Sequence, residues 1–520
     1  MKKYITVVLF SCMSISLQAQ EVFDALRLGQ TDINGTARFQ AMSGAFGALG
    51  GDLSAMGINP AGSAIFSNNQ WGLSLSDNIV KNKTNYYDTR TQSSKNSINL
   101  NQAGAVFVFE NYDPNSKWNK FSLGLNYEKT GNYDNDVFSA GTSKNSIANY
   151  FLSYANDFNG VPGIRLGALQ NIRLTNDSYE KATFADQQAA LGFQAYIFEP
   201  IPFASDPTNF NDPNIKSYSS NIRLGGDYKQ ENSIVTSGGT SKFTFNAAAQ
   251  YDKWLSIGLN LNSHTTDYKQ STSFLEITTL PLDANYQVNN VRFNNRIHTT
   301  GGGFSMQVGA IAKVNKMLRL GLTYESPTWY ELTDEISQDL RSVSTKLVGT
   351  NAAPLPADVA DPKLTKVLDP YSIQTPGKLT ISGALIFAKN GLLSIDASTK
   401  DYSNSNFGPS ADFRRVNNQL AKNLTNSVEI KVGGEYRIKQ LSLRGGFRTE
   451  QSPYKDKKIM SDLVGFSAGL GYNWGDTKLD FAFSQTRRTS ENQFFYQGFT
   501  DASTTRAVNN NATLTLTFEL

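Results

Sequence analysis

Alternation of apolar with polar or small residues restricts the fold of this chain more than any other feature of its sequence. Along Phe121–Glu128, aromatic residues and leucine occupy every second position, and serine, glycine, asparagine and glutamate occupy the positions between them. The same period of two recurs in KFTFNAAAQY, LSIGLNLNS, KLTISGALIF, SVEIKVGGEYRI, VGFSAGLGYNW and TLTLTFEL. Segments of about ten residues with one apolar face are typical of strands that face lipid on one side and a polar interior on the other.

A closed barrel is the architecture that suits such strands. After the first twenty residues, the sequence has no run of the roughly 18 apolar residues that a membrane-spanning helix needs. Charged residues make up only 18% of the chain, against a typical value of about 25%. A barrel joins every backbone hydrogen bond between strands, which is the other way to cross lipid. We therefore predict an all-β fold, a transmembrane antiparallel β-barrel.

Short connections between the alternating runs give the number of strands. Six of them are predicted to be hairpin turns, which gives twelve strands, and one further strand lies at each end, the first from Asn69 and the last to Leu520. Residues 67–520 should therefore form a barrel of about 14 strands, an even number as in other bacterial barrels. The six predicted turns are Asn111–Asn119, Asp252–Lys253, Asn315–Lys316, Lys389–Asn390, Lys439–Gln440 and Gly475.

The other seven connections are predicted to be long, which sets the orientation of the barrel. The longest covers residues 131–240 and contains possible helices at Ser146–Phe158 and Ala185–Phe198. Short turns of such barrels belong on the periplasmic side and long loops on the extracellular side. The tryptophans agree, with four at the short-turn ends and one near the other rim: Trp71, Trp118, Trp254 and Trp474, and then Trp329.

The chain begins like a secreted protein. Lys2 and Lys3 precede a mainly apolar stretch, and Ala19 offers a cleavage site, so residues 1–19 are predicted to be a signal peptide. An alternative is a lipoprotein signal that ends at Cys12, the only cysteine of the chain. Signal and barrel together predict the outer membrane of a diderm bacterium. Cleavage would remove Lys2 and Lys3, so the formal net charge of +3 would fall to about +1 (3 − 2 = 1). A net charge this close to zero gives no reason to expect a nucleic-acid partner.

A glycine-rich segment precedes the first strand, within residues 20–66. The stretch SGAFGALGGDLSAMGINPAGSAIF, Ser43–Phe66, is not a nucleotide loop, because no strand and helix of a βαβ unit surround it. Asp52, Asn59 and Pro60 exclude a spanning helix. We predict that residues 20–66 form a hatch that plugs the lumen. Inward glycines of the wall support this by leaving space, although glycine kinks that relieve curvature are an alternative: Gly124, Gly258, Gly309, Gly321, Gly433, Gly446 and Gly469.

Four stretches resemble one known family. They are NPAG at Asn59–Gly62, LRLGLTYESP at Leu318–Pro327, TPGKLTISGAL at Thr375–Leu385 and GGEYRIKQLSLRGGFRTEQSPY at Gly433–Tyr454. In this order they are similar to the FadL family of outer-membrane transporters for long-chain fatty acids and other hydrophobic compounds. The resemblance implies a fourteen-stranded barrel with an N-terminal hatch. It also implies capture of an apolar ligand by the outer loops, a shift of the hatch, and lateral release into the membrane.

Candidate site residues lie in the hatch and on the C-terminal strands. The resemblance marks Asn59, Pro60, Ala61 and Gly62 as the hatch motif. Candidates for contact with an apolar ligand are Phe46, Leu49, Met56, Ile58 and Phe66. Candidates for an anionic head group are the inward-facing Arg437, Arg444 and Arg448, for which pairing with Glu429 and Glu435 is the alternative. In the long loop, five apolar residues have two interpretations of equal weight: they form a surface that captures the ligand, or they are ordinary loop packing. They are Ala190, Leu191, Phe193, Ile197 and Phe198.

Three other functions compete with transport of hydrophobic compounds. A hydrolase would use His264 or His298, with Ser263 and Asp267 near His264 in sequence. A haem receptor would need axial ligands, and two histidines without a mature cysteine offer no pair that we would name. A porin or adhesin would keep an open lumen. We favour a monomeric transporter rather than an enzyme, without metal or cofactor, whose partners are a hydrophobic small molecule, outer-membrane lipid and lipopolysaccharide, and the barrel-assembly machinery.

Overall fold

The computed structural model describes residues 22–174, 177–280, 288–348, 351–354, 358–387 and 390–520. The predicted signal peptide, residues 1–19, and the alternative at Cys12 lie outside the described residues. Among the helices of the described part, none is long and apolar enough to cross a membrane.

The wall is a closed antiparallel barrel of fourteen strands, as predicted. The barrel closes because the first strand pairs with the last as well as with the second, with Trp71 opposite Phe518 and Leu73 opposite Leu516. The wall strands are β1 (Gln70–Tyr86), β2 (Thr89–Glu110), β3 (Trp118–Asn132), β7 (Tyr228–Tyr251), β8 (Leu255–Thr278), β9 (Val288–Lys313), β10 (Leu318–Glu325), β16 (Lys378–Phe387), β17 (Gly391–Asp401), β19 (Asn426–Ile438), β20 (Leu441–Glu450), β21 (Leu463–Asn473), β22 (Thr477–Gln493) and β23 (Ala502–Glu519).

The predicted hairpin turns all fall between consecutive wall strands, although Lys389 itself lies outside the described residues. One of the seven connections predicted to be long is short instead. Strands β1 and β2 continue to a two-residue turn at Tyr87 and Asp88. Beyond Lys81 and Asn96, where these strands leave the apolar band, both of their faces are polar, so the alternation that marked the other strands disappears.

The outside of the wall is apolar and the inside is polar, which explains the alternation. Outward side chains remain exposed to the surroundings, where lipid covers them, among them Leu123, Phe245, Leu259, Val308, Leu322, Ile381, Leu470 and Phe481. Inward positions hold buried polar residues, among them Asn126, Asn246, Asn260 and Gln307. All five tryptophans are exposed, and Trp71 stacks on Phe518 with ring centroids 4.4 Å apart. This is the aromatic belt expected at a membrane boundary.

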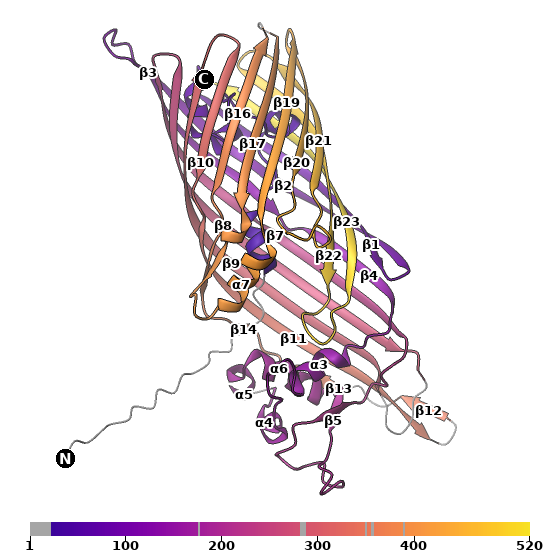
Figure 1. The fold of residues 1–520 in the computed structure, drawn as a ribbon. Helices are drawn as coiled ribbons and strands as arrows, with labels where there is room; N and C mark the ends of the chain where they lie inside the picture. The colour runs from indigo at the N-terminus through magenta and orange to yellow at the C-terminus, as the bar shows by residue number, and fades with distance from the viewer. Residues whose placement is uncertain (1–21, 175–176, 281–287, 349–350, 355–357, 388–389) are drawn as a thin grey trace, which may run out of the picture.

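The end of the barrel opposite the short turns, which we predict to be extracellular, carries a cap built mainly from the connection between β3 and β7 (Figure 1). The two predicted helices are present, with shorter bounds. The elements of this connection are β4 (Asn135–Ser143), α3 (Ala148–Ala155), α4 (Leu166–Asn171), α5 (Asp177–Lys181), α6 (Phe184–Gln194), β5 (Phe198–Pro200) and β6 (Tyr218–Ser220). The range 131–240 is therefore not all loop, since it also includes β4 and the first part of β7.

The remaining outer elements follow β10 and β17. They are β11 (Trp329–Val348), β12 (Asn351–Pro354), β13 (Asp358–Ala360), β14 (Lys366–Val367), β15 (Tyr371–Gln374), η3 (Tyr402–Asn404), β18 (Asn406–Gly408) and α7 (Arg414–Asn423). Strand β11 extends the wall outward by pairing with β9 along most of its length.

The cap has an aromatic core. Phe151 of α3 packs edge to face on Phe293 of β9, with centroids 5.4 Å apart, and Phe274, Phe495 and Phe499 belong to the same cluster. Four of the five residues proposed for a capture surface are fully buried here: Ala190, Leu191, Ile197 and Phe198. Their burial supports the alternative of ordinary loop packing.

Candidate functional site

The N-terminal segment lies inside the barrel, and we call its described residues, 22–66, the hatch (Figure 1). It contains α1 (Val22–Gly29), α2 (Ala37–Ala41) and the two short 3-10 helices η1 (Ser54–Gly57) and η2 (Pro60–Ile65). Helix α2 lies against β21, β22 and β23, and Ala37 and Ala41 pack on Ala482. The segment thus enters the bore as small residues in short turns rather than as one long helix.

The seven inward glycines of the wall touch the hatch. A Cβ atom added to any of them would come closer than 3.0 Å to a hatch atom. The pairs are Gly124 with Met56, Gly258 with Pro60, Gly309 with Asn59, Gly321 with Gly47, Gly433 and Gly446 with Met42, and Gly469 with Ala41. The prediction that these glycines make room for an inserted segment is confirmed, because the approach leaves no space for a side chain.

The NPAG motif fixes the turn of the hatch that meets β9. Asn59 is fully buried, and its Nδ2 donates to the carbonyl of Gly47 at 2.7 Å and to that of Ala310 on the wall at 3.1 Å. Its Oδ1 accepts from the backbone N–H of Ala61 at 3.1 Å and caps η2. Pro60 begins η2, where its missing N–H needs no partner. One asparagine therefore joins two hatch turns to the barrel.

Wall amides satisfy the carbonyls that the irregular hatch leaves free. Asn260 donates to the carbonyl of Met56 at 2.8 Å, and Asn246 to that of Pro60 at 2.9 Å. Gln307 donates to the carbonyl of Ile58 at 3.0 Å. A buried carbonyl without a partner is costly, so these amides are part of the hatch fold. Sequence reasoning missed them, although inward asparagine and glutamine on neighbouring strands β7, β8 and β9 were a visible signal.

A carboxylate of the wall holds the other side of the hatch. Asp396 of β17 accepts hydrogen bonds from the backbone N–H groups of Phe46 and Gly47, both at 3.0 Å. Within the hatch, Thr36 caps α2 by accepting from Phe39 at 3.1 Å and donates to Asp52 at 2.8 Å. The mostly buried hatch therefore has a defined polar framework of its own.

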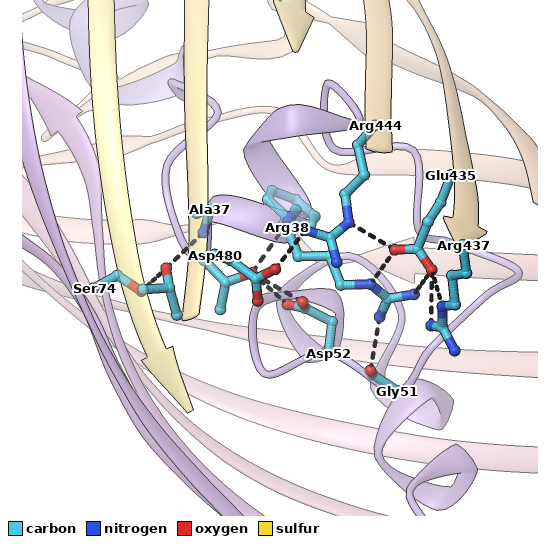
Figure 2. Close-up of polar contacts among 12 residues, drawn as sticks. Ala37, Arg38, Gly51, Asp52, Ser74, Glu435, Arg437, Arg444 and Asp480 are labelled. Carbon is cyan, nitrogen blue, oxygen red and sulfur yellow. Dashed lines mark hydrogen bonds and ion pairs between the residues drawn. The ribbon is translucent and has the colours of Figure 1, made fainter. Parts of the chain in front are cut away.

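One ionic cluster joins the hatch to the C-terminal strands (Figure 2). Arg38 of α2 pairs with Glu435 of β19 at 2.8 Å, and its Nη1 donates to the carbonyl of Gly51 at 3.0 Å. Glu435 also pairs with Arg437 and Arg444, each at 2.7 Å, and Arg444 reaches Asp480 of β22. The side chain of Glu435 is only 1% exposed, so this carboxylate is a buried partner shared by three guanidinium groups.

The structure places the three arginines predicted for an anionic head group, but it does not test whether they bind a ligand. Arg437 and Arg444 pair with Glu435, which was the alternative that the sequence left open. Arg448 lies 3.8 Å from Glu450, and Glu429 pairs with Lys378 and Lys431 instead of an arginine. A ligand role for these arginines stays a prediction.

The predicted apolar contacts are buried between the hatch and the wall. Phe46 and Leu49 pack with Phe39 and Met42, and Ile58 lies at the edge of this cluster. Met56 and Phe66 pack with Leu53 and with Val106 of β2. In this arrangement they contact protein, so their predicted role in ligand contact requires the hatch to move.

Two small cavities with partly polar linings adjoin the hatch. A cavity of about 40 Å³ lies under α1, with Lys242, Lys400, Glu325 and His264 in its lining. A second cavity of about 30 Å³ lies beside α2, with Asn34, Gln40 and Arg448 in its lining. An apolar cavity that holds benzene measures about 150 Å³. Neither of these two cavities is large enough for such a ligand. We call this arrangement, with the hatch seated against the wall glycines, the closed form.

Helix α1 adjoins the first of these cavities, with Leu28 and Gly29 in its lining. Leu26 and Leu28 pack into an aromatic cluster that includes Tyr330, Tyr371, Tyr402 and Phe407. Arg27 pairs with Asp24 at 3.0 Å, and its guanidinium lies 3.6 Å from the ring centroid of Tyr268. Such cation–π contact is favourable when the cation is removed from water.

A break in the wall lies between β2 and β3. Backbone pairing of these strands extends from Glu110 opposite Lys120 to Gln102 opposite Glu128. Beyond a bulge after Lys129, β3 and then β4 pair with β7. Side chains bridge the two edges instead: Lys129 donates to Asn99 at 2.7 Å, and Asn132 donates to Ser97 at 3.1 Å. We call this part of the wall the polar seam.

The structure separates the residues of the hydrolase hypothesis. His264 faces the lumen and hydrogen-bonds to Ser305 at 2.9 Å, whereas Ser263 faces outward as the next residue of the same strand. Asp267 also faces outward, where it meets His298 at 3.1 Å. Neighbours in sequence lie on opposite faces of a strand, so Ser263 and Asp267 cannot serve His264.

A transmembrane barrel with a polar lumen filled by its own N-terminal segment defines a plugged outer-membrane protein. Comparison with known proteins shows to which family of outer-membrane proteins the chain belongs. Residues 216–518 match the family described as "Outer membrane protein transport protein (OMPP1/FadL/TodX)", and the chain belongs to this family. The family consists of outer-membrane transporters of hydrophobic compounds rather than enzymes, so the resemblance seen in the sequence is confirmed.

A solved structure shows the same fold. The crystal structure of a Pseudomonas aeruginosa FadL homologue is 13% identical and matches over 94% of this chain and 99% of that chain, with a TM-score of 0.52. The Pseudomonas putida toluene transporter TodX is 14% identical over 94% of this chain and 99% of its own, with a TM-score of 0.49. Among curated proteins, no match was found.

Proposed function

We propose that this protein takes up hydrophobic small molecules by capturing them outside, displacing the hatch and releasing them sideways into the membrane. The family accounts for outer-membrane transport as such; the cargo and the route are our proposal. The observation that carries it is the set of seven glycine contacts, which seat the hatch across the lumen. Because the wall is shaped around the hatch, cargo passes only when the hatch moves.

The chemistry of the hatch favours an apolar cargo, such as a long-chain fatty acid or an aromatic compound. Movement of the hatch uncovers Phe46, Leu49 and Met56, which are at most 4% exposed in the closed form. An apolar cargo can cover this surface and so offset a cost of about 25 cal/mol for each Å² exposed to water. A polar solute cannot compensate in this way.

The polar seam supports the lateral step. Along the seam, side chains rather than backbone hydrogen bonds join β2 to β3 and β4. Ile98 and Leu100 of β2, which are 77% and 43% exposed, mark the lipid-facing side of the seam. Parting a few side-chain bonds costs less than opening a backbone ladder, since each net hydrogen bond contributes about 1 kcal/mol. Release here keeps an apolar cargo out of the periplasmic water.

A disulfide across the hatch tests the proposal. The hydroxyl oxygens of Ser43 in the hatch and Ser467 on β21 lie 2.8 Å apart, and the only natural cysteine is Cys12 in the predicted signal peptide. We expect S43C/S467C, once oxidised, to lose uptake of a labelled fatty acid and of labelled toluene by reconstituted vesicles. Reduction should restore uptake.

The matched control is T380C/S398C, which joins β16 to β17 without involving the hatch. These hydroxyl oxygens lie 2.9 Å apart, and the two residues are directly opposite in the ladder. The oxidised control should transport like the parent protein. Full uptake by oxidised S43C/S467C would show that cargo does not need the hatch to move.

A further inference from the structure

Four basic residues form a patch on the outside of the barrel, on the wall formed by β22, β23 and β1. Lys81 and Lys83 of β1, Arg487 of β22 and Arg506 of β23 are all exposed and occupy outward positions. The ladder sets Lys81 in one row with Val508 and Arg487, and it sets Lys83 directly opposite Arg506. We call these four residues the basic patch.

The basic patch lies at the level of the outer-leaflet head groups. Lys81 is ten residues along β1 from Trp71 of the periplasmic aromatic belt. At about 3.4 Å per residue and a strand tilt of about 40°, this spacing is about 26 Å along the membrane normal. The apolar band of such barrels is about 25 Å tall. The patch therefore begins where the hydrocarbon ends.

Apolar residues cover most of the wall below the patch. Outward positions of the three strands hold Leu73, Leu75 and Ile79, Phe481 and Phe483, and Leu514 and Leu516. Directly below the patch, Gln485 and Asn510 also face outward and hydrogen-bond to each other, and Asp77 is the charged exception. A molecule seated on this wall thus meets cations at one end and mainly apolar side chains further down. This division matches a lipid with an anionic head group.

The cations of the patch form no ion pairs with carboxylates of the described residues, although Asp77 and Glu491 lie on the outward faces of the same strands. Among the described residues, no ion pair joins Lys81, Lys83, Arg487 or Arg506 to a carboxylate; the next residue, Arg488, faces inward and pairs with Glu450. Like charges directly opposite in a ladder, as in Lys83 and Arg506, destabilise a sheet. An external anion removes this repulsion.

The opposite wall is different. On β8, β9 and β11, some outward basic side chains lie beside acids: Arg296 lies 3.1 Å from Asp339, and His298 lies 3.1 Å from Asp267 and 3.6 Å from Glu335. Arg292 and Arg341 of the same wall are directly opposite each other in the ladder. That wall therefore balances part of its outward charge within the protein, whereas no ion pair does so for the basic patch among the described residues.

We propose that the basic patch binds the phosphates of a lipid with a phosphorylated sugar head group, of the lipopolysaccharide type. Each phosphate monoester carries about −1.5 to −2 charges, so two phosphates match the four cations. The acyl chains lie along the leucines and phenylalanines below. Such a lipid fixes the depth and rotation of the barrel in the outer leaflet, which transport itself does not require.

The experiment measures binding of diphosphoryl lipid A to the full-length protein in detergent, by native mass spectrometry and thermophoresis. The patch variant is K81Q/K83Q/R487Q/R506Q. The control K269Q/R292Q/R296Q/R341Q removes the same number of outward positive charges from β8, β9 and β11. Heat-modified gel mobility confirms that both variants are folded. We expect the patch variant to bind at least about tenfold more weakly, and the control to bind within about twofold of the parent.

Two further probes identify what is recognised. Dephosphorylated lipid A should bind parent and patch variant equally weakly, and inorganic phosphate should not compete at concentrations where lipid A saturates. Equal loss in both variants, unchanged binding by the patch variant, or undiminished binding of the dephosphorylated lipid would each overturn the proposal. Tight binding of inorganic phosphate alone, or of an acidic protein in preference to the lipid, would also overturn it.

Discussion

The barrel is closed twice, and the two closures use different chemistry. At the hatch, the wall meets backbone turns through glycines, wall amides and one ionic cluster around Glu435. At the extracellular cap, the wall meets Phe151 and its aromatic neighbours. Hydrogen bonds that part during movement are replaced by bonds to water at small net cost, whereas exposing aromatic surface to water costs about 25 cal/mol for each Å². At the hatch this second cost falls on Phe46, Leu49 and Met56, which an apolar cargo can cover. The hatch interface is suited to opening and the cap to staying closed.

This difference explains where the small residues occur. Much of the contact between the hatch and the wall uses glycine and alanine, so backbones approach closely there, although Met56 and Phe66 of the hatch also pack with Val106 of β2. The cap buries large rings that pack edge to face. Interlocked side chains resist sliding because interiors are densely packed. A surface of small residues allows a segment to leave and return without repacking.

The largest expected effect comes from filling one glycine contact. In Gly258→Leu the new side chain meets the backbone of Pro60, which cannot give way. We expect the hatch to be displaced and the barrel to conduct ions steadily in planar bilayers, where the parent stays closed. Gly434→Leu is the control, because a Cβ at this position meets its nearest neighbours at 3.6 Å, an ordinary contact. A closed Gly258→Leu barrel would mean that the contact does not hold the hatch.

The next effect tests the cap. Phe151→Ala removes a fully buried ring from the aromatic cluster, and such changes cost about 3–5 kcal/mol. We expect faster tryptic cleavage at Arg165, Arg173 and Lys181 in the connection between β3 and β7, with ion conductance unchanged. Phe210→Ala is the control, since Phe210 is 48% exposed in the same connection. If Phe151→Ala opens the barrel to ions, the two closures are not independent.

Sequence reasoning succeeded where one local rule governs a whole element. Alternation marked each wall strand where one face meets lipid, and the inward glycines marked the plug. It failed on β1 and β2 above Lys81, because strands outside the membrane no longer need an apolar face. It also could not select Glu435 as the partner of Arg38, since 397 residues separate them and the choice depends on how the hatch is seated. The break between β2 and β3 depends on a single bulge, which the alternation does not show.

The smallest of the three effects concerns that ionic cluster. Glu435→Gln leaves Arg38 and Arg444 without their shared negative charge, and removal of one partner from a buried pair costs about 3 kcal/mol. Because the cost falls on the closed form, the hatch should open more often while the barrel stays folded. Ser43 is 4% exposed when the hatch is closed, so S43C reports opening through its rate of labelling by a maleimide. We expect Glu435→Gln to raise this rate about 10- to 100-fold, and Glu491→Gln, on the exposed rim, to leave it unchanged. Equal labelling rates in the two variants would show that Glu435 stabilises the wall and not the closed hatch. The polar contacts that hold the hatch would then be those of the wall amides Asn246, Asn260 and Gln307.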